Sequence, residues 1–267
     1  MAGRLHQVSK WGGLRAALFV WTLSASAHPS VGLVITPNGD VFYSDLERVW
    51  RVTPNGQKIV AVPDVHAHEL ALEDGAVLGE DSEWLGGNRY RHRIFKRAPD
   101  GRVTDVVPWT NGFWQQYGLV RDAAGARYWV DCGSDSPARR CTIRKRDRAG
   151  RVTDVVTSGR IHSLLGGKAG EVYYVEGTEL RRANGTKVER VAAIGEQLMG
   201  LARDAAGNVY VAAHASREVV RIAPNGTKQV IARSTAPWAP SGVAVSPRGE
   251  VWVLEWSGTQ SRVRRTR

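Results

Sequence analysis

The feature that most constrains this chain is a pattern of short strands that recurs six times. In the fifth copy, residues 200–232, runs rich in Val, Tyr and Ile flank the turns Ala206-Gly207 and Asn225-Gly226. Asn-Gly is the strongest short-range hairpin signal, and these residue types are typical of strands. A four-stranded antiparallel sheet of this size cannot bury both of its faces, so each copy must pack against others.

The spacing of the copies indicates how they are assembled. Successive copies begin 37, 49, 45, 37 and 42 residues apart. A period of about 40 residues with four strands is typical of a propeller blade, because radial repetition leaves only short, protected edges. We therefore expect an all-β, six-bladed β-propeller with four-stranded antiparallel blades over residues 28–267. The six copies begin at Gly32, Glu69, Gly118, Ser163, Gly200 and Gly242.

Two of the copies resemble a known repeat. The segments PSGVAVSPRGEVWV (residues 240–253) and GNVYVA (residues 207–212) resemble NHL repeats. The predicted domain as a whole resembles the six-bladed propellers that include the gluconolactonase (senescence-marker protein) family. The resemblance implies the fold, but it implies no single activity, because this architecture hosts hydrolases, lyases and binding proteins.

The last copy is incomplete. Its predicted strands are residues 242–246, 251–255 and 261–265, and no further strand follows them. Either the sixth blade has three strands, or residues 18–31 supply the fourth. The second arrangement would argue against removal of the N-terminal segment.

Residues 1–27 differ in composition from the repeats. They contain Arg4, Lys10 and Arg15 without any acidic residue, then an apolar run over residues 16–23 and a small-x-small site at residues 25–27. This order is typical of a secretory signal peptide, and the apolar run is too short to span a bilayer. We expect a secreted or periplasmic protein. A retained N-terminus, either disordered or strand-forming, is the alternative.

The charge of the chain limits its partners. The net charge is +11, and it falls to +8 without residues 1–27. The basic residues are spread along predicted strands and hairpins, and no DNA- or RNA-binding motif accompanies them, so a solvated basic face is expected. No later stretch is long and apolar enough for a membrane helix. We expect a monomer whose partner is a small molecule, carbohydrate or peptide, and neither nucleic acid nor a membrane.

The chain contains two cysteines, Cys132 and Cys141, on either side of one predicted loop of the third blade. In an oxidising compartment such a pair forms a disulfide. A metal–thiolate site is the weaker interpretation, because no histidine neighbours the two thiols. We expect a structural disulfide.

The repeat register brings polar residues to one end of the central channel. Antiparallel pairing places the start of each first strand beside the end of each second strand, at what we call the strand-start mouth, and the glycine hairpins occupy the opposite face. Carboxylates and imidazoles that share a water-filled mouth suit a divalent metal or an acid/base pair, and tryptophans can stack on a flat ligand. The residues selected in this way are His68, Glu80, Asp81, Tyr117, Asp131, His162, His214, Trp238, Glu255 and Trp256.

These residues support three functional hypotheses. In the first, the mouth binds a small ligand, sugar or peptide through Glu80, Asp81, Tyr117, Asp131, His214, Trp238 and Trp256, without chemistry. In the second, the chain is a metal-dependent hydrolase or lyase. One Ca²⁺ or Zn²⁺ is then held by His68, His162, Glu80 and Asp131, and His68, His162 and Glu255 are catalytic. In the third, the chain is a protein-interaction scaffold that uses its outer faces.

The family resemblance bears on the metal hypothesis. Gluconolactonase-like propellers hold one divalent cation with a Glu, an Asn and an Asp near the starts of inner strands. This chain has Tyr117, Met199 and Ser241 at such positions, so the metal-binding triad does not carry over. An acidic residue at the end of a second strand also has a structural interpretation, in which it accepts hydrogen bonds from nearby backbone amides.

Overall fold

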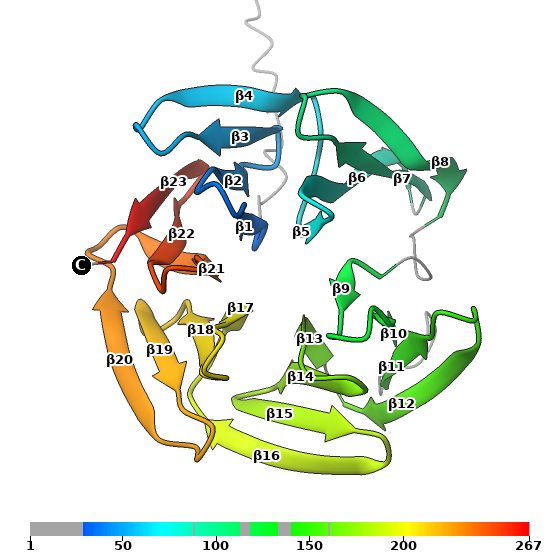
Figure 1. The fold of residues 1–267 in the computed structure, drawn as a ribbon, viewed down its shortest axis with the longest axis vertical. Coiled ribbons are helices and arrows are strands. Elements are labelled where there is room, and N and C mark those ends of the chain that lie inside the picture. Colours follow the sequence, from blue (N-terminus) through cyan, green and yellow to red (C-terminus); the bar gives the residue numbers. More distant parts are fainter. Residues whose placement is uncertain (1–28, 88, 113–117, 133–139, 160, 267) are drawn as a thin grey trace, which may run out of the picture.

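The computed structural model describes residues 29–87, 89–112, 118–132, 140–159 and 161–266. These residues form six antiparallel sheets arranged in a ring around a central channel (Figure 1). In every sheet the first strand in sequence is the innermost, as shown by β1, β5, β9, β13, β17 and β21 around the centre of Figure 1. The predicted six-bladed β-propeller is confirmed.

Consecutive strands make up each blade. Blade 1 contains β1 (Leu33–Ile35), β2 (Val41–Ser44), β3 (Arg48–Val52) and β4 (Lys58–Pro63). Blade 2 contains β5 (Leu70–Glu73), β6 (Ala76–Gly86), β7 (Arg89–Arg97) and β8 (Val103–Asn111). Blade 3 contains β9 (Val120–Arg121), β10 (Arg127–Cys132), β11 (Cys141–Arg146) and β12 (Val152–Ser158).

The second half of the ring repeats this connectivity. Blade 4 contains β13 (Ile161–Gly166), β14 (Glu171–Glu176), β15 (Glu179–Asn184) and β16 (Lys187–Ala193). Blade 5 contains β17 (Leu198–Arg203), β18 (Val209–Ala213), β19 (Glu218–Ile222) and β20 (Lys228–Arg233). Blade 6 contains β21 (Ala239–Val245), β22 (Val251–Ser257) and β23 (Gln260–Arg265).

The hydrophobic core lies between neighbouring blades. Tyr173 and Val175 of blade 4 pack with Val209, Val211 and Ile222 of blade 5 in one buried cluster. A comparable cluster joins blade 6 to blade 1. Alternate residues of each strand therefore face different neighbours, as the period-2 pattern of the sequence requires. Burying each such side chain fully contributes about 1.5–3 kcal/mol.

Polar turns hold the hairpins between first and second strands. The Asp122 carboxylate accepts hydrogen bonds from the backbone N–H groups of Ala124 and Ala126 and from the Tyr128 hydroxyl. It also accepts one from Gly170 of the next blade, at 2.8 Å. Burial would raise the pKa of Asp122, but these hydrogen bonds outweigh it and lower the pKa. One carboxylate thus fixes a turn and links blades 3 and 4.

The ring closes through its inner strands. The sixth sheet has the order β21-β22-β23, so the three-stranded alternative is the one found among the described residues. Strand β21 lies against β1, and the backbone of Gly242 is close to that of Val31. The predicted signal peptide, residues 1–27, lies outside the described residues. No helix in the described part of the chain is long and apolar enough to cross a membrane.

The predicted disulfide is present between Cys132 and Cys141. It joins the end of β10 to the start of β11, where the two residues are directly paired. The bond closes the loop whose residues 133–139 lie outside the described part, and Cys141 itself is buried in the core between blades 3 and 4.

Replacing both cysteines tests the contribution of this bond. We expect the double variant Cys132→Ser/Cys141→Ser to lose about 2–3 kcal/mol of unfolding free energy, because the small loop is no longer closed in the unfolded chain. Urea unfolding of the two proteins measures the difference. A reductant should lower the stability of the native sequence to the same extent and leave the double variant unchanged. Equal midpoints for all samples would contradict a stabilising role.

Candidate functional site

The central channel encloses a cavity of about 410 Å³. Its walls come from the innermost strands of all six blades, so residues far apart in the sequence meet there. Most of the lining residues are aliphatic, and polar atoms make up about half of the surface exposed to the cavity. The aliphatic residues with the longest side chains are Leu33, Ile35, Leu70, Leu72, Leu119, Leu164, Leu165 and Leu201.

The polar lining residues lie at opposite ends of the cavity. Glu69 directly precedes β5, at the strand-start mouth, whereas Arg121 and Arg203 end β9 and β17, at the hairpin face. The first strands all begin at the same end, because each blade repeats one connectivity. A four-residue strand such as β5 is about 13 Å long. The Glu69 carboxyl is therefore separated from the guanidinium groups of Arg121 and Arg203 by a stretch of aliphatic side chains. Arg121 forms an ion pair with Glu73, at 2.9 Å.

Glu69 is the one acidic residue among the described residues that line the cavity. Burial raises the pKa of its carboxyl. The physical cause is the loss of water around a charge-bearing group in aliphatic surroundings, which favours the neutral form. Raised carboxyl pKa values are frequent at binding and catalytic sites, which makes Glu69 a candidate functional residue.

A smaller pocket opens between blades 2, 3 and 4 at the same end. We call it the side pocket; its volume is about 200 Å³. Glu80 is 6 % exposed, and its carboxylate accepts a hydrogen bond from the backbone N–H of His68, at 3.1 Å. Ser163 occupies a β-bulge in β13, a feature that re-aims side chains. The side pocket is lined by Glu69, Glu80, Leu119, Val120, Tyr128, Trp129, Val130, Ser163 and Leu164.

The two histidines predicted to be catalytic lie elsewhere. The ring of His68 packs edge-to-face on that of His66, with centroids 4.7 Å apart, and the backbone carbonyl of His68 accepts a hydrogen bond from Val31. His162 is an exposed residue of β13. Neither residue belongs to the lining of the central cavity or of the side pocket.

The predicted metal ligands do not form a coordination group. Among the described residues, no three His, Cys, Asp or Glu side chains are placed to hold a metal ion. Asp131 instead forms an ion pair with Arg144, at 3.2 Å. The set His68, Glu80, Asp131 and His162 therefore does not fit Ca²⁺ or Zn²⁺ in this arrangement, and we derive no metal-dependent step.

Two further predicted carboxylates are held by arginines. Asp81 pairs with Arg93 at 2.9 Å and accepts a hydrogen bond from the backbone of His66. Glu255 is fully buried and pairs with Arg262 and Arg264, each at 2.7 Å. Burial would raise the pKa of Glu255, but hydrogen bonds from Ser234 and the two arginines outweigh it and lower the pKa. These contacts give Glu255 a structural role away from the cavity.

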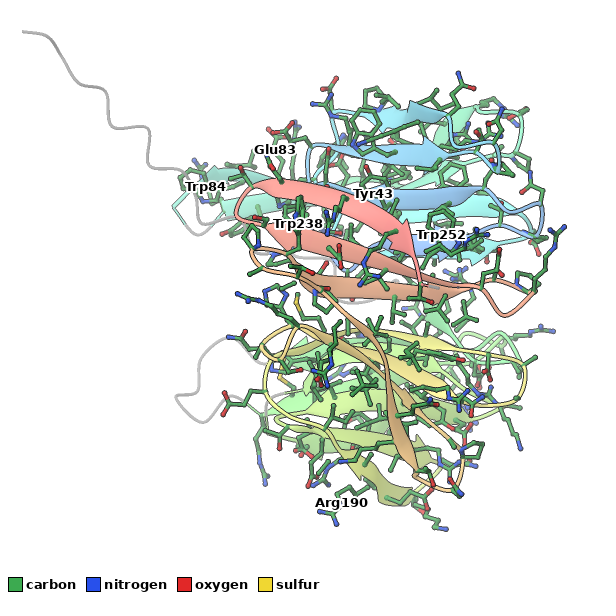
Figure 2. All side chains as sticks on the ribbon, turned by 90° about the vertical axis from the view of Figure 1, so that its left-hand side faces the viewer. Tyr43, Glu83, Trp84, Arg190, Trp238 and Trp252 are labelled. Carbon is green, nitrogen blue, oxygen red and sulfur yellow. A yellow bond between two sulfur atoms is a disulfide. The ribbon has the colours of Figure 1, made fainter. Side chains whose placement is uncertain are left out.

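The tryptophans predicted to stack on a ligand at the strand-start mouth do not line the cavity. Trp256 lies within β22 rather than in a loop, and at 3 % exposure it packs in the core between blades 6 and 1. The Arg262 guanidinium lies over the ring of Trp238, with its Cζ 4.2 Å from the ring centroid. Trp84, 64 % exposed, is at the projecting end of blade 2 (Figure 2). The His214 Nδ1 lies within hydrogen-bond distance of the Pro240 carbonyl oxygen, at 3.1 Å, and Tyr117 lies outside the described residues.

Glu69 was not among the predicted site residues, although the repeat register carries a signal for it. At its position the other five copies have Gly32, Gly118, Ser163, Gly200 and Gly242. Glu80 is a similar exception, because the corresponding residues are Ser44, Val130, Val175, Ala212 and Leu254. Both exceptions occur in blade 2, and both residues line the side pocket.

The raised pKa of Glu69 leads to a stability prediction. The folded protein binds the proton of Glu69 more tightly than the unfolded chain does, so this residue lowers stability as the pH rises. We expect Glu69→Gln to raise the unfolding free energy at pH 7 by on the order of 1 kcal/mol, and the gain to vanish below about pH 4, where both states are protonated. Urea unfolding at the two pH values measures this.

Glu73→Gln, at the far end of the strand β5 that Glu69 precedes, is the matched control. It removes the partner of Arg121 and should lower stability at pH 7 by about 1 kcal/mol. A loss of stability in Glu69→Gln at pH 7, or a gain that persists at low pH, would contradict the assignment of a raised pKa.

Comparisons with known proteins agree with the fold. No protein-family profile and no curated protein matches the chain. A gluconolactonase from Xanthomonas campestris is 12 % identical, with a TM-score of 0.61 over 90 % of this chain and 87 % of its own. The calcium-binding protein regucalcin from Agrobacterium tumefaciens is 18 % identical, with a TM-score of 0.57 over 85 % and 83 %.

A third solved structure has a different function. An auxiliary nutrient-binding protein from Bacteroides thetaiotaomicron is 10 % identical, with a TM-score of 0.64 over 90 % of this chain and 69 % of its own. At these identities the likeness concerns the fold. The chain thus has the propeller fold found in gluconolactonase-like proteins, as its repeats predicted.

Proposed function

We propose that this chain is a binding propeller that takes a compact small molecule with an aliphatic body into its central cavity. The observation that carries the proposal is the cavity of about 410 Å³ walled by all six inner strands. Ligand sites typically have volumes of about 300–1,000 Å³ and combine hydrophobic side chains with a few placed polar groups. Transfer of apolar surface from water would drive binding, at about 25 cal/mol per Å².

The lining favours an aliphatic ligand over a sugar. Among the described residues that line the cavity, none is aromatic. Sugar sites commonly use aromatic faces for stacking, and Trp238 and Trp256 are engaged elsewhere. The first functional hypothesis is therefore kept, with its location moved from the predicted tryptophan rim to the aliphatic interior of the channel.

Two further points support binding outside the cytoplasm. The nutrient-binding protein of similar fold illustrates that propellers of this shape serve as binding proteins. The Cys132–Cys141 disulfide is compatible with an oxidising compartment, and we propose that the protein acts in the periplasm or the extracellular space. The monomeric state and the lack of a nucleic-acid partner stay predictions.

Filling the cavity tests the proposal. We expect 1-hexanol to bind with a dissociation constant on the order of 1 mM, as its small size allows. Leu201→Trp places a larger side chain in the cavity wall and should weaken this binding at least about fivefold, because it occupies the space of the ligand. Titration followed by two-dimensional amide NMR gives both the affinity and the residues that respond.

Leu85→Trp is the matched control, since Leu85 is exposed on β6 and is not a lining residue of the cavity. It should bind 1-hexanol as the native sequence does. Equal weakening in both variants, or responses confined to residues outside the channel, would overturn the proposed site. Thermal unfolding of each variant confirms that it is folded.

A further inference from the structure

We infer that the side pocket recognises an ammonium group with a neighbouring hydroxyl, so that the ligand of the channel is an amino alcohol with an aliphatic tail. The inference rests on the proposed function and deepens it. Four observations support it. The side pocket is lined by carboxyls, and one of them, Glu69, has no ion-pair partner among the described residues. The indole N–H of Trp129 is buried without an acceptor, and the lining of the side pocket continues into that of the central cavity.

The lining of the side pocket is acidic. Its described residues include Glu69 and Glu80 and no lysine, arginine or histidine. Two carboxyls in one pocket of about 200 Å³ favour a positively charged guest, since charges attract more strongly in a partly buried site than in bulk water. An ammonium group supplies three donors for such oxygens.

Glu69 lacks the arginine partner that three of the predicted site carboxylates have. Asp81, Asp131 and Glu255 each pair with one or two arginines of their own blade. Within the described residues, Glu69 forms no comparable ion pair. The raised pKa of Glu69 agrees with this setting. A bound ammonium would provide the opposite charge that stabilises its ionised form.

Trp129 indicates what else the ligand carries. It lines the side pocket, and its indole N–H is buried without a hydrogen-bond partner in the described part of the chain. A buried donor without an acceptor is costly. An ammonium cannot accept this hydrogen bond, whereas a hydroxyl oxygen can. The neighbouring Tyr128 hydroxyl is already committed to Asp122, at 2.9 Å.

The two cavities share part of their lining, and this fixes how the ligand would lie. Residues common to both are Glu69, Leu119, Val120, Ser163 and Leu164. A polar head in the side pocket can therefore continue as a tail in the aliphatic channel. Glu69 lies at the junction, where it can contact the ammonium group.

Four six-carbon compounds test the inference on the full-length folded protein. We expect 2-amino-1-hexanol to bind most tightly, followed by hexylamine and 1-hexanol, with hexanoate weakest because of repulsion by the carboxylates. The amino alcohol should bind at least about tenfold more tightly than 1-hexanol. Calorimetry or NMR titration at pH 7 and low salt measures the four dissociation constants.

Variants separate the two recognition elements. Glu69→Gln should weaken binding of the amino alcohol at least about tenfold. It should change the dissociation constant of 1-hexanol by no more than about twofold. Trp129→Phe should remove the preference for the amino alcohol over hexylamine, because it deletes only the indole donor. Glu83→Gln, on an exposed residue of the same blade, should change none of these values (Figure 2).

The outcomes distinguish this inference from the proposed function. If 1-hexanol binds in the channel but the amino alcohol binds no tighter, or if Glu69→Gln has no selective effect, the amino-alcohol inference is wrong and the aliphatic site stands. If hexylamine and the amino alcohol bind equally, the hydroxyl assignment fails. If none of the four compounds binds, both the inference and the proposed function fall.

Discussion

The close approach of inner-strand backbones is the constraint on which the rest of this structure depends. A β-carbon on Gly200 would lie 2.8 Å from the carbonyl oxygen of Ser241, and one on Gly242 would lie 2.8 Å from that of Val31. Such distances leave no room for a side chain, so glycine permits blades 5, 6 and 1 to meet. In blade 6, which has three strands among the described residues, this contact carries the closure of the ring.

The candidate site lies where glycine at the start of the inner strand is replaced by a larger residue. Blade 2 has Glu69 where four other blades have glycine and one has serine. The long side chain of Glu69 lines the side pocket, and so does Glu80, the second residue at which blade 2 differs from the other blades. Burial of the Glu69 carboxyl disfavours its ionised form and so raises its pKa. Residues that oppose stability in this way are the ones expected to serve binding or chemistry.

The fold could be predicted from sequence because hairpin turns and period-2 strands are local signals that every copy repeats. The functional site was harder to predict, because the acidic residues at the ends of the second strands have arginine partners on the neighbouring strand. Asp81 is directly opposite Arg93, and Glu255 is directly opposite Arg262. Residues that the sequence presents as free acids are therefore members of cross-strand ion pairs. Trp256 directly follows the predicted strand of residues 251–255, but β22 continues through it and buries it. Glu69 required comparison between copies rather than a search for reactive residue types.

The short sixth blade leaves the outer edge of β23 without a neighbouring strand in the described part of the chain. An edge of this kind invites another polypeptide to extend the sheet. Here Arg262, Arg264 and Arg265 occupy three of its six positions. If two molecules met edge to edge, rows of guanidinium groups would face one another, and like charges oppose pairing. The same arginines that fix Glu255 and Glu250 inside one molecule thus also work against polymerisation.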